Sequence, residues 1–222
     1  MTSLPSDESG ISLPFKPRVW LPPKLTVWFS EVVLTAPDGR AWCEQKAGAL
    51  LGEGAQGKDV GRLADCLEAY LEIFRKEMPL VIGAIFFYPD YATLPPQATM
   101  VMHVLVGDPD RPGDPDGGPI TMVMARESMT RPDPAFVGEP DLSEAEVPAG
   151  PALRVRRIRK VDPGKRRSKT MAEIIWLVWP PGSSAVVMMT TRWNEVSFSR
   201  AAGIVADGIA RHFRVDPKDQ TP

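Results

Sequence analysis

The sequence predicts an α+β fold in which helices pack on a mainly antiparallel sheet. Apolar residues recur at helical spacing between residues 60 and 74, which predicts one long amphipathic helix. Runs of β-prone residues lie at 80–88, 97–106, 173–179 and 185–192, and the short turns between them favour antiparallel pairing. With 222 residues and 43% apolar content, the chain is large enough to bury a substantial core.

The first part of the chain is expected to carry an arm, short strands and two helices. Residues 1–18 are polar and contain prolines, so we expect a flexible N-terminal arm, and residues 19–34 contain short β-prone runs. A short helix should run from Asp38, its expected N-cap, to a stop at Gly52. Asp59 precedes the long helix, and its carboxylate is a preferred N-cap acceptor for the first N–H groups.

The second half is expected to alternate strands with loops. Residues 120–129 fit a short helix or a strand, and both alternatives stay open. The proline-rich stretch 131–151 is expected to be irregular. The turn PPGSS should join 173–179 and 185–192 into a hairpin, and residues 194–213 form an amphipathic terminal helix.

The expected organisation is one α+β domain over residues 19–215, with the arm at 1–18 and a flexible C-terminal tail at 216–222. The beginning of the sequence has no basic segment followed by an apolar run of signal-peptide length. No stretch approaches the roughly 18–20 apolar residues that span a bilayer. A soluble cytoplasmic protein is the expectation.

Residues 52–59 read GEGAQGKD and match the first seven positions of the phosphate-binding loop G-x-x-x-x-G-K-[ST]. Asp59 stands where the pattern requires a hydroxyl that binds Mg²⁺. The segment also follows an expected helix rather than a strand, and the aspartate would bring negative charge toward the phosphates. We interpret the match as a coincidence in which the glycines link two helices and Asp59 caps the second.

Spacing reveals no catalytic or metal constellation. His103 and His212 are far apart and accompany no nucleophile motif, so no triad can be assembled. Prolines interrupt the acidic loop at 107–119, which favours a solvated loop over a calcium site; its aspartates are Asp108, Asp110, Asp114 and Asp116. Cys43 and Cys66 lie in expected helices, where free cysteines behave as small apolar residues. No catalytic residue, cofactor or metal is predicted.

A dense basic segment is the one candidate interaction site. Its nine cationic side chains are Arg154, Arg156, Arg157, Arg159, Lys160, Lys165, Arg166, Arg167 and Lys169. Leu153 and Val155 alternate with arginines, which predicts a strand over Arg154–Val161 with its arginines toward solvent, followed by a mobile loop at about 162–170. Arg157 breaks the alternation, as a β-bulge would.

Three interpretations of this basic segment stay open. It is a solvated face, a docking surface for a protein or other acidic partner, or a nucleic-acid site. The segment contains no aromatic residue for base stacking, and the chain carries a net charge of −2, so nucleic acid is the least favoured.

The layout from Trp20 to Val215 resembles a group of uncharacterised small bacterial proteins with PsbP-like α/β folds. The segments that carry the resemblance are WLPP (20–23), AGALLG (47–52), VIGAIFF (81–87), EVPAGPALRVRR (146–157), IIWLVWPP (174–181) and TTRWNE (190–195). The irregular stretch 120–145 departs from the regular helix that the family pattern has there. The resemblance implies an antiparallel sheet covered by helices, and a role in binding or assembly rather than catalysis.

The function expected from these observations is that of a non-enzymatic interaction or accessory protein of a larger assembly, with a protein partner that is acidic. The alternative is a small-ligand-binding protein or an enzyme whose site combines residues distant in sequence, for example around His103 and the methionines. A convergent polar pocket would favour the alternative, whereas an apolar surface patch would favour docking.

Overall fold

A computed structural model describes residues 2–3, 15–19, 29–32, 39–77, 81–87, 98–106, 119–161, 169–194 and 198–217. In chain order its elements are β1 (Thr2–Ser3), β2 (Phe15–Val19), β3 (Phe29–Val32), α1 (Gly39–Leu51), α2 (Gly57–Glu77), β4 (Val81–Phe87), β5 (Ala98–Val106), α3 (Met122–Thr130), β6 (Phe136–Val147), β7 (Gly150–Val161), β8 (Lys169–Val178), β9 (Ala185–Trp193), α4 (Ser199–His212) and β10 (Arg214–Pro217). The predicted α+β class is confirmed.

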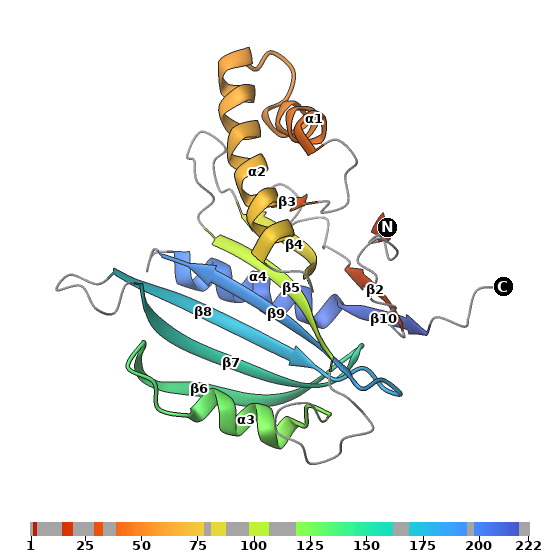
Figure 1. Ribbon diagram of the computed structural model, residues 1–222, viewed down its shortest axis with the longest axis vertical. Coiled ribbons are helices and arrows are strands. Elements are labelled where there is room, and N and C mark those ends of the chain that lie inside the picture. Colours follow the sequence, from red (N-terminus) through yellow and green to blue (C-terminus); the bar gives the residue numbers. More distant parts are fainter. Residues whose placement is uncertain are drawn as a thin grey trace.

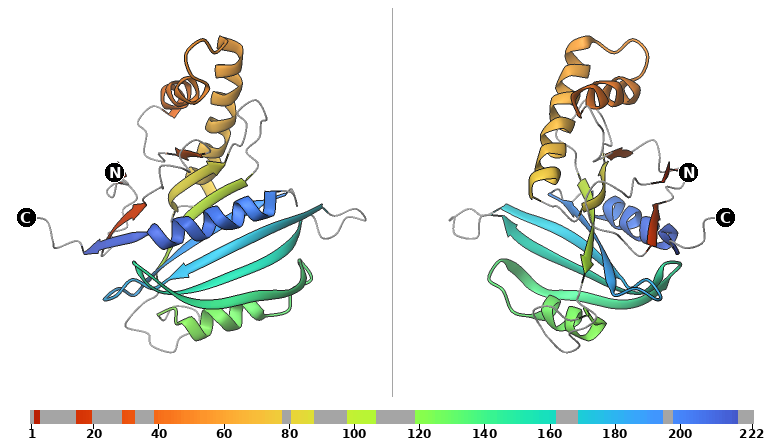
Figure 2. Two further views of the ribbon diagram at one scale, coloured as in Figure 1. Left: turned by 180° about the vertical axis from the view of Figure 1, so that it is seen from behind. Right: turned by 45° about the vertical axis from the view of Figure 1, so that its right-hand side comes forward.

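A seven-stranded antiparallel sheet organises the described residues, in the order β3-β4-β5-β9-β8-β7-β6. Helix α4 crosses one face of this sheet (Figures 1 and 2). Helix α3 lies on the opposite face below β6 and β7, and the α1–α2 pair rises from the end of the sheet formed by β3, β4 and β5. Because side chains alternate along a strand, each strand contributes to both faces.

The largest core lies between the sheet and α4. Apolar side chains of β5, β8 and β9 pack there against Ala202, Ala206 and Ile209 of α4. Trp193, at the end of β9, is 2% exposed, and its indole Nε1 donates a hydrogen bond to the Ser199 hydroxyl at 2.9 Å. This contact ties the first residue of α4 to the strand that precedes it, so the sequence-predicted hairpin and terminal helix form one packed unit.

Two smaller cores occupy the opposite face. The predicted apolar stripe of α2 is confirmed, because Leu63, Leu67 and Leu71 are buried against α1, Ala84 and Val101. The second core joins α3 to β7, β8 and β9; its buried members are Ala125, Leu153, Val155, Ile175, Leu177 and Val186. Strands β8 and β9 also bear the buried polar side chains Glu173 and Thr190 on this face.

The start of α2 differs from the prediction. Gly57 and Lys58 are already helical, and the Gln56 carbonyl accepts hydrogen bonds from the N–H groups of Asp59 (2.9 Å) and Val60 (3.1 Å). Asp59 therefore lies within the first turn instead of capping the helix. The segment still joins two helices, so it lacks the strand-to-helix setting of a phosphate-binding loop.

The preceding helix, α1, ends as expected. Gly52 has a φ of 81°, a left-handed conformation that suits glycine after a helix, and its N–H donates to the Gly48 carbonyl at 3.0 Å. Asp38, its expected N-cap, lies outside the described residues. Both cysteines are helical as expected, with Cys43 buried and Cys66 half-buried.

The stretch 120–151 is more regular than expected. Helix α3 settles the open choice at 120–129, and the Thr121 side chain caps it by accepting a hydrogen bond from the Met124 N–H at 3.2 Å. The prediction that residues 131–151 are irregular is wrong over the greater part of that stretch, because β6 pairs with β7 from Phe136 to Val147. Prolines fit there because β6 is an edge strand, and Pro140 lies at a register shift where no ladder hydrogen bond is required.

A second, three-stranded sheet joins segments from the two ends of the described chain. Strand β2 lies between β1 and β10, antiparallel to both. Residues expected to form an arm and a tail thus include paired strands, because β10 continues directly from α4 and offers a free edge to β2 (Figure 1). Val215 of β10 packs against the core under α4.

Candidate functional site

The basic strand β7 has arginines on both faces, in contrast to the predicted single solvent-facing row. Its register with β8 is continuous from Ala152 to Val161, so no bulge is present where one was expected. Arg154 and Arg156 therefore lie on the α4 side of the sheet, while Arg157 and Arg159 lie on the α3 side. The expected single basic face is wrong, and the two sides carry different arrangements.

On the α3 side, Arg157 belongs to a buried ion network. Glu173, which is 0% exposed, accepts a hydrogen bond from Arg157 Nε with one carboxylate oxygen and from Arg192 Nε with the other at 3.1 Å. The Arg157 side chain is 16% exposed and lies over the Phe136 ring, 4.0 Å from its centroid. Two guanidinium groups thus share one carboxylate, which leaves the network with an excess positive charge.

His103 lies on the same side of the sheet and responds to this charge. Burial lowers the pKa of the His103 imidazole, and the positive charge of Arg192 lowers it further. A neutral imidazole is therefore favoured beside the network.

On the α4 side, Arg154 is held by the helix. Asp207 of α4 accepts hydrogen bonds from Arg154 Nε at 2.8 Å and from the Trp176 indole Nε1 at 3.2 Å. The Arg154 side chain is 19% exposed and that of Asp207 is 29% exposed. Arg154 therefore anchors α4 to the sheet, and its positive charge is paired with Asp207.

A groove of about 510 Å³ opens beside this ion pair, between β7, β8 and the N-terminal half of α4. Its lining consists of Arg154, Arg156, Ile174, Ser199, Arg200, Gly203, Ile204 and Asp207. Three arginines and one aspartate give the groove a net charge of +2. Among the described residues, Arg156 and Arg200 are exposed and make no ion pair.

Exposed apolar side chains lie in the groove lining and elsewhere on the same side of the sheet. Ile204, on α4, is 60% exposed, and Ile158, two residues after Arg156 on β7, is 43% exposed. Val137 pairs with Ile158 across the β6–β7 ladder and is also 43% exposed. The α4 side of the sheet therefore combines cationic and apolar surface next to the helix N-terminus.

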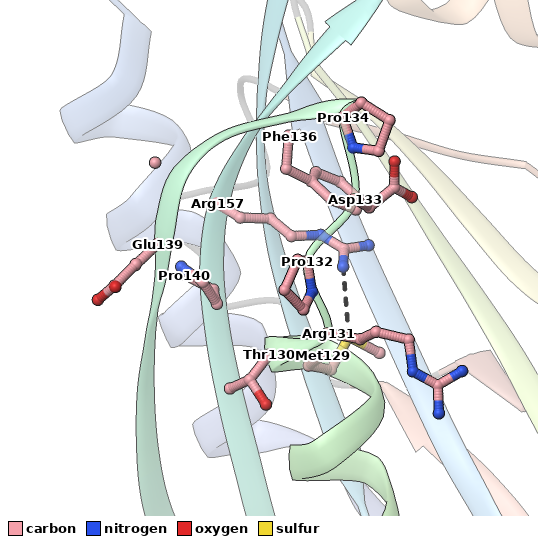
Figure 3. Close-up of a pocket in the computed structure, with 11 residues that line it drawn as sticks. Met129, Thr130, Arg131, Pro132, Asp133, Pro134, Phe136, Glu139, Pro140 and Arg157 are labelled. Atoms are coloured by element: carbon pink, nitrogen blue, oxygen red, sulfur yellow. Dashed lines mark hydrogen bonds between the residues drawn. The ribbon is translucent and has the colours of Figure 1, made fainter.

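A second hollow of about 600 Å³ lies on the α3 side, where α3 ends and β6 begins (Figure 3). It is lined by Met129, Thr130, Arg131, Pro132, Asp133, Pro134, Phe136, Gly138, Glu139, Pro140 and Arg157. Figure 3 shows the Arg157 side chain extending across this pocket between Phe136 and Met129. Its Nη1 lies 3.5 Å from the Met129 sulfur.

The other described members of the predicted basic cluster, Arg159, Lys160 and Lys169, are dispersed. Arg159 is exposed on the α3 side, and Lys160 Nζ donates to the Pro134 carbonyl at 3.3 Å. Lys169 and Thr170, which were expected in a loop at about 162–170, belong to β8. Lys165, Arg166 and Arg167 lie outside the described residues, as do the four aspartates of the acidic loop.

Sequence reasoning missed the residues that give these sites their chemistry. The residues missed are Glu173 and Asp207, which pair with arginines of β7, Arg192, which shares Glu173, and Arg200, which lines the groove beside Arg156. A signal existed for Glu173 alone, because a glutamate within an apolar strand requires a cationic partner when buried.

Comparison with known proteins assigns no family to the chain. No protein-family model matches it, and no curated protein matches its sequence. The solved structures similar to it include LpqN, a protein involved in cell envelope biogenesis of Mycobacterium tuberculosis, at 18% identity and a TM-score of 0.43, covering 64% of this chain and 75% of LpqN. The PsbP-like resemblance is not confirmed by these comparisons.

Two absences hold for the described residues alone. None of their helices has both the length and the apolar character needed to cross a bilayer. Within the same part of the chain, no three side chains of histidine, cysteine, aspartate or glutamate converge as metal ligands would.

Proposed function

We propose that this chain is an interaction protein that captures an acidic partner segment in the groove beside α4. The observation that carries the proposal is the pairing of two exposed arginines, Arg156 and Arg200, with exposed apolar side chains on the same side of the sheet. The partner fitted to this surface is a protein segment in which carboxylates alternate with apolar residues.

The architecture of the groove favours capture of a partner over a purely structural role. The Arg154–Asp207 pair already holds α4 on the sheet, so Arg156 and Arg200 are not needed for that contact. Arginine forms paired hydrogen bonds with carboxylates, and long arginine stems can cover apolar surface while their charged heads stay in water. Both features suit a shallow groove with exposed apolar surface on the same side of the sheet.

The local charge favours a short acidic segment over a long polyanion. Asp141 of β6 lies opposite Arg156 in the strand register, on the same face of the sheet. Its carboxylate would repel phosphates that extend beyond the groove. A peptide can place its carboxylates at the two arginines and its apolar side chains near Ile204.

The test measures binding of a fluorescein-labelled peptide in which glutamate alternates with leucine. Wild-type protein should bind it saturably, and the affinity should fall as salt rises from about 50 to 300 mM because exposed charges are screened. Changing Arg156→Glu and Arg200→Glu together should weaken binding at least tenfold.

The matched control changes Arg62→Glu and Arg211→Glu, which alters the net charge equally at two exposed arginines outside the groove. Its affinity should stay within twofold of the wild type. Equal losses in both double variants would show that net charge, and not the groove, attracts the peptide. Unchanged binding after the Arg156 and Arg200 changes would overturn the proposal.

A further inference from the structure

The pocket on the α3 side is built around a cation that the fold holds in place. Arg157 is oriented by three contacts at once: its Nε donates to buried Glu173, its guanidinium lies over Phe136, and its Nη1 approaches the Met129 sulfur. A guanidinium fixed in this way loses little conformational freedom when it binds a ligand. The remaining N–H groups of Arg157 border the pocket, whose lining includes this side chain.

The charge of the site selects the charge of its ligand. Glu173 divides its two oxygens between Arg157 and Arg192, so this trio has one positive charge that is not neutralised. Arg131, Asp133 and Glu139 also line the pocket, so the lining together with Glu173 and Arg192 is neutral overall and the positive charge is local to Arg157. The Asp133 carboxylate accepts a hydrogen bond from the Ala135 N–H at 2.7 Å, and Figure 3 shows Glu139 pointing away from Arg157. A single carboxylate matches the local charge at Arg157, whereas a doubly charged phosphate would bring a second negative charge toward Asp133, whose carboxylate also lines the pocket.

The walls select an apolar body for the same ligand. Met129, Phe136 and three prolines, Pro132, Pro134 and Pro140, supply most of the surface that is not charged. The volume of about 600 Å³ falls within the roughly 300–1,000 Å³ typical of small-molecule pockets. A compact aliphatic or aromatic body would cover the ring of Phe136 and the thioether of Met129.

We infer that this pocket binds a small amphipathic monocarboxylate, with the carboxylate at Arg157 and the apolar body against Met129, Phe136 and the prolines. The site lies on the opposite side of the sheet from the α4 groove, so it does not depend on capture of an acidic partner. It gives a location to the small-ligand alternative that the sequence left open, although its central residues are Arg157 and Phe136 rather than His103.

The experiment titrates 3-phenylpropionate into full-length protein labelled with ¹³C at the methionine methyl groups. The Met129 methyl resonance, assigned from Met129→Leu, should shift saturably, while that of Met189, which is buried on the α4 side, should not. The neutral analogue 3-phenylpropionamide should bind at least tenfold more weakly, because it lacks the charge that faces Arg157. Inorganic phosphate should produce no saturable shift at Met129.

Two variants and one control locate the binding determinants. Arg157→Lys keeps the positive charge but removes the planar guanidinium, so it should weaken binding of 3-phenylpropionate at least tenfold. Phe136→Leu leaves the Arg157–Glu173 pair in place and should weaken binding of the acid and of the amide equally. This variant keeps the test decisive if Arg157→Lys does not fold. Glu127→Gln, at an exposed carboxylate of α3 outside the pocket lining, should leave binding within about threefold.

Different outcomes would overturn different parts of the inference. Equal binding of acid and amide, or phosphate binding as tight as that of the acid, would overturn the assignment of a monocarboxylate. Absence of any saturable shift at Met129 would overturn the pocket itself. None of these results bears on whether the glutamate–leucine peptide binds the α4 groove, so the two proposals can fail separately.

Discussion

Replacement of Glu173 by glutamine should destabilise the protein far more than loss of an exposed ion pair. Glu173 is 0% exposed and accepts a charged hydrogen bond on each oxygen, from Arg157 and from Arg192. Glu173→Gln keeps one acceptor but turns an NH₂ group toward a guanidinium, which can only donate.

The expected magnitude follows from these contacts. Hydrogen bonds to charged groups contribute about 1.5–3 kcal/mol each, and breaking a buried pair by removing one partner costs about 3–5 kcal/mol. We therefore expect Glu173→Gln to lower the free energy of unfolding by about 3–5 kcal/mol, a large fraction of the roughly 5–15 kcal/mol typical of a folded protein. Urea denaturation followed by tryptophan fluorescence measures this loss.

A control and a double variant test the reasoning. Glu144 pairs with Arg126 where both side chains are about half exposed, so Glu144→Gln should cost no more than about 1 kcal/mol. Glu173→Met combined with Arg157→Met should cost less than the sum of the two single changes, because neither charge is then left alone in the interior. If Glu173→Gln costs as little as Glu144→Gln, Glu173 does not hold a buried network and the excess charge inferred for Arg157 is wrong.

Two other predictions concern the α1–α2 link and His103. Lys58→Ala should leave the free energy of unfolding unchanged, and calorimetry should show no saturable binding of ATP or GTP to the wild type or the variant. Asp59→Ala should lower the free energy of unfolding by about 0.3–1 kcal/mol, because its charge lies in the first turn of α2. Micromolar nucleotide affinity that is lost in Lys58→Ala would contradict this interpretation. Because the pKa of His103 is lowered in the folded protein, the unfolded chain binds the proton more tightly. The free energy of unfolding should therefore fall as pH decreases below about 6.5. Urea denaturation at pH 7.5 and 5.5 should show a smaller difference in the free energy of unfolding between the two pH values for His103→Gln than for the wild type. His212→Gln is the matched loss of an imidazole, and an equal reduction in that variant would contradict the assignment to His103.

Segments with one uninterrupted period were predictable from the sequence. The stripe of α2 and the β8–β9 hairpin each repeat a single spacing, so local patterning determines which face is buried. Strand β6 was missed because Gly138 and Pro140 interrupt its alternation at a register shift. Both residues predict a loop locally, and only pairing with β7 makes the segment a strand.

The candidate sites were less predictable because their contacts depend on register and packing. The face on which Arg157 lies follows from unbroken pairing with β8, and its partner Glu173 is 16 residues away in sequence. Arg154 meets Asp207 at a separation of 53 residues, through the placement of α4 on the sheet. A count of basic residues identifies the strand but not which charges are neutralised.

The bulge in β6 also limits how this protein can associate with copies of itself. Among the described residues, no strand pairs with the outer side of β6, so its backbone there is a template for an added strand. The shift between Val137 and Asp141 restricts regular addition to Asp141–Val147, a segment that carries Glu144 and Glu146. A second copy adding the same segment would place acidic side chains near acidic side chains, so repulsion would disfavour growth of the sheet from molecule to molecule.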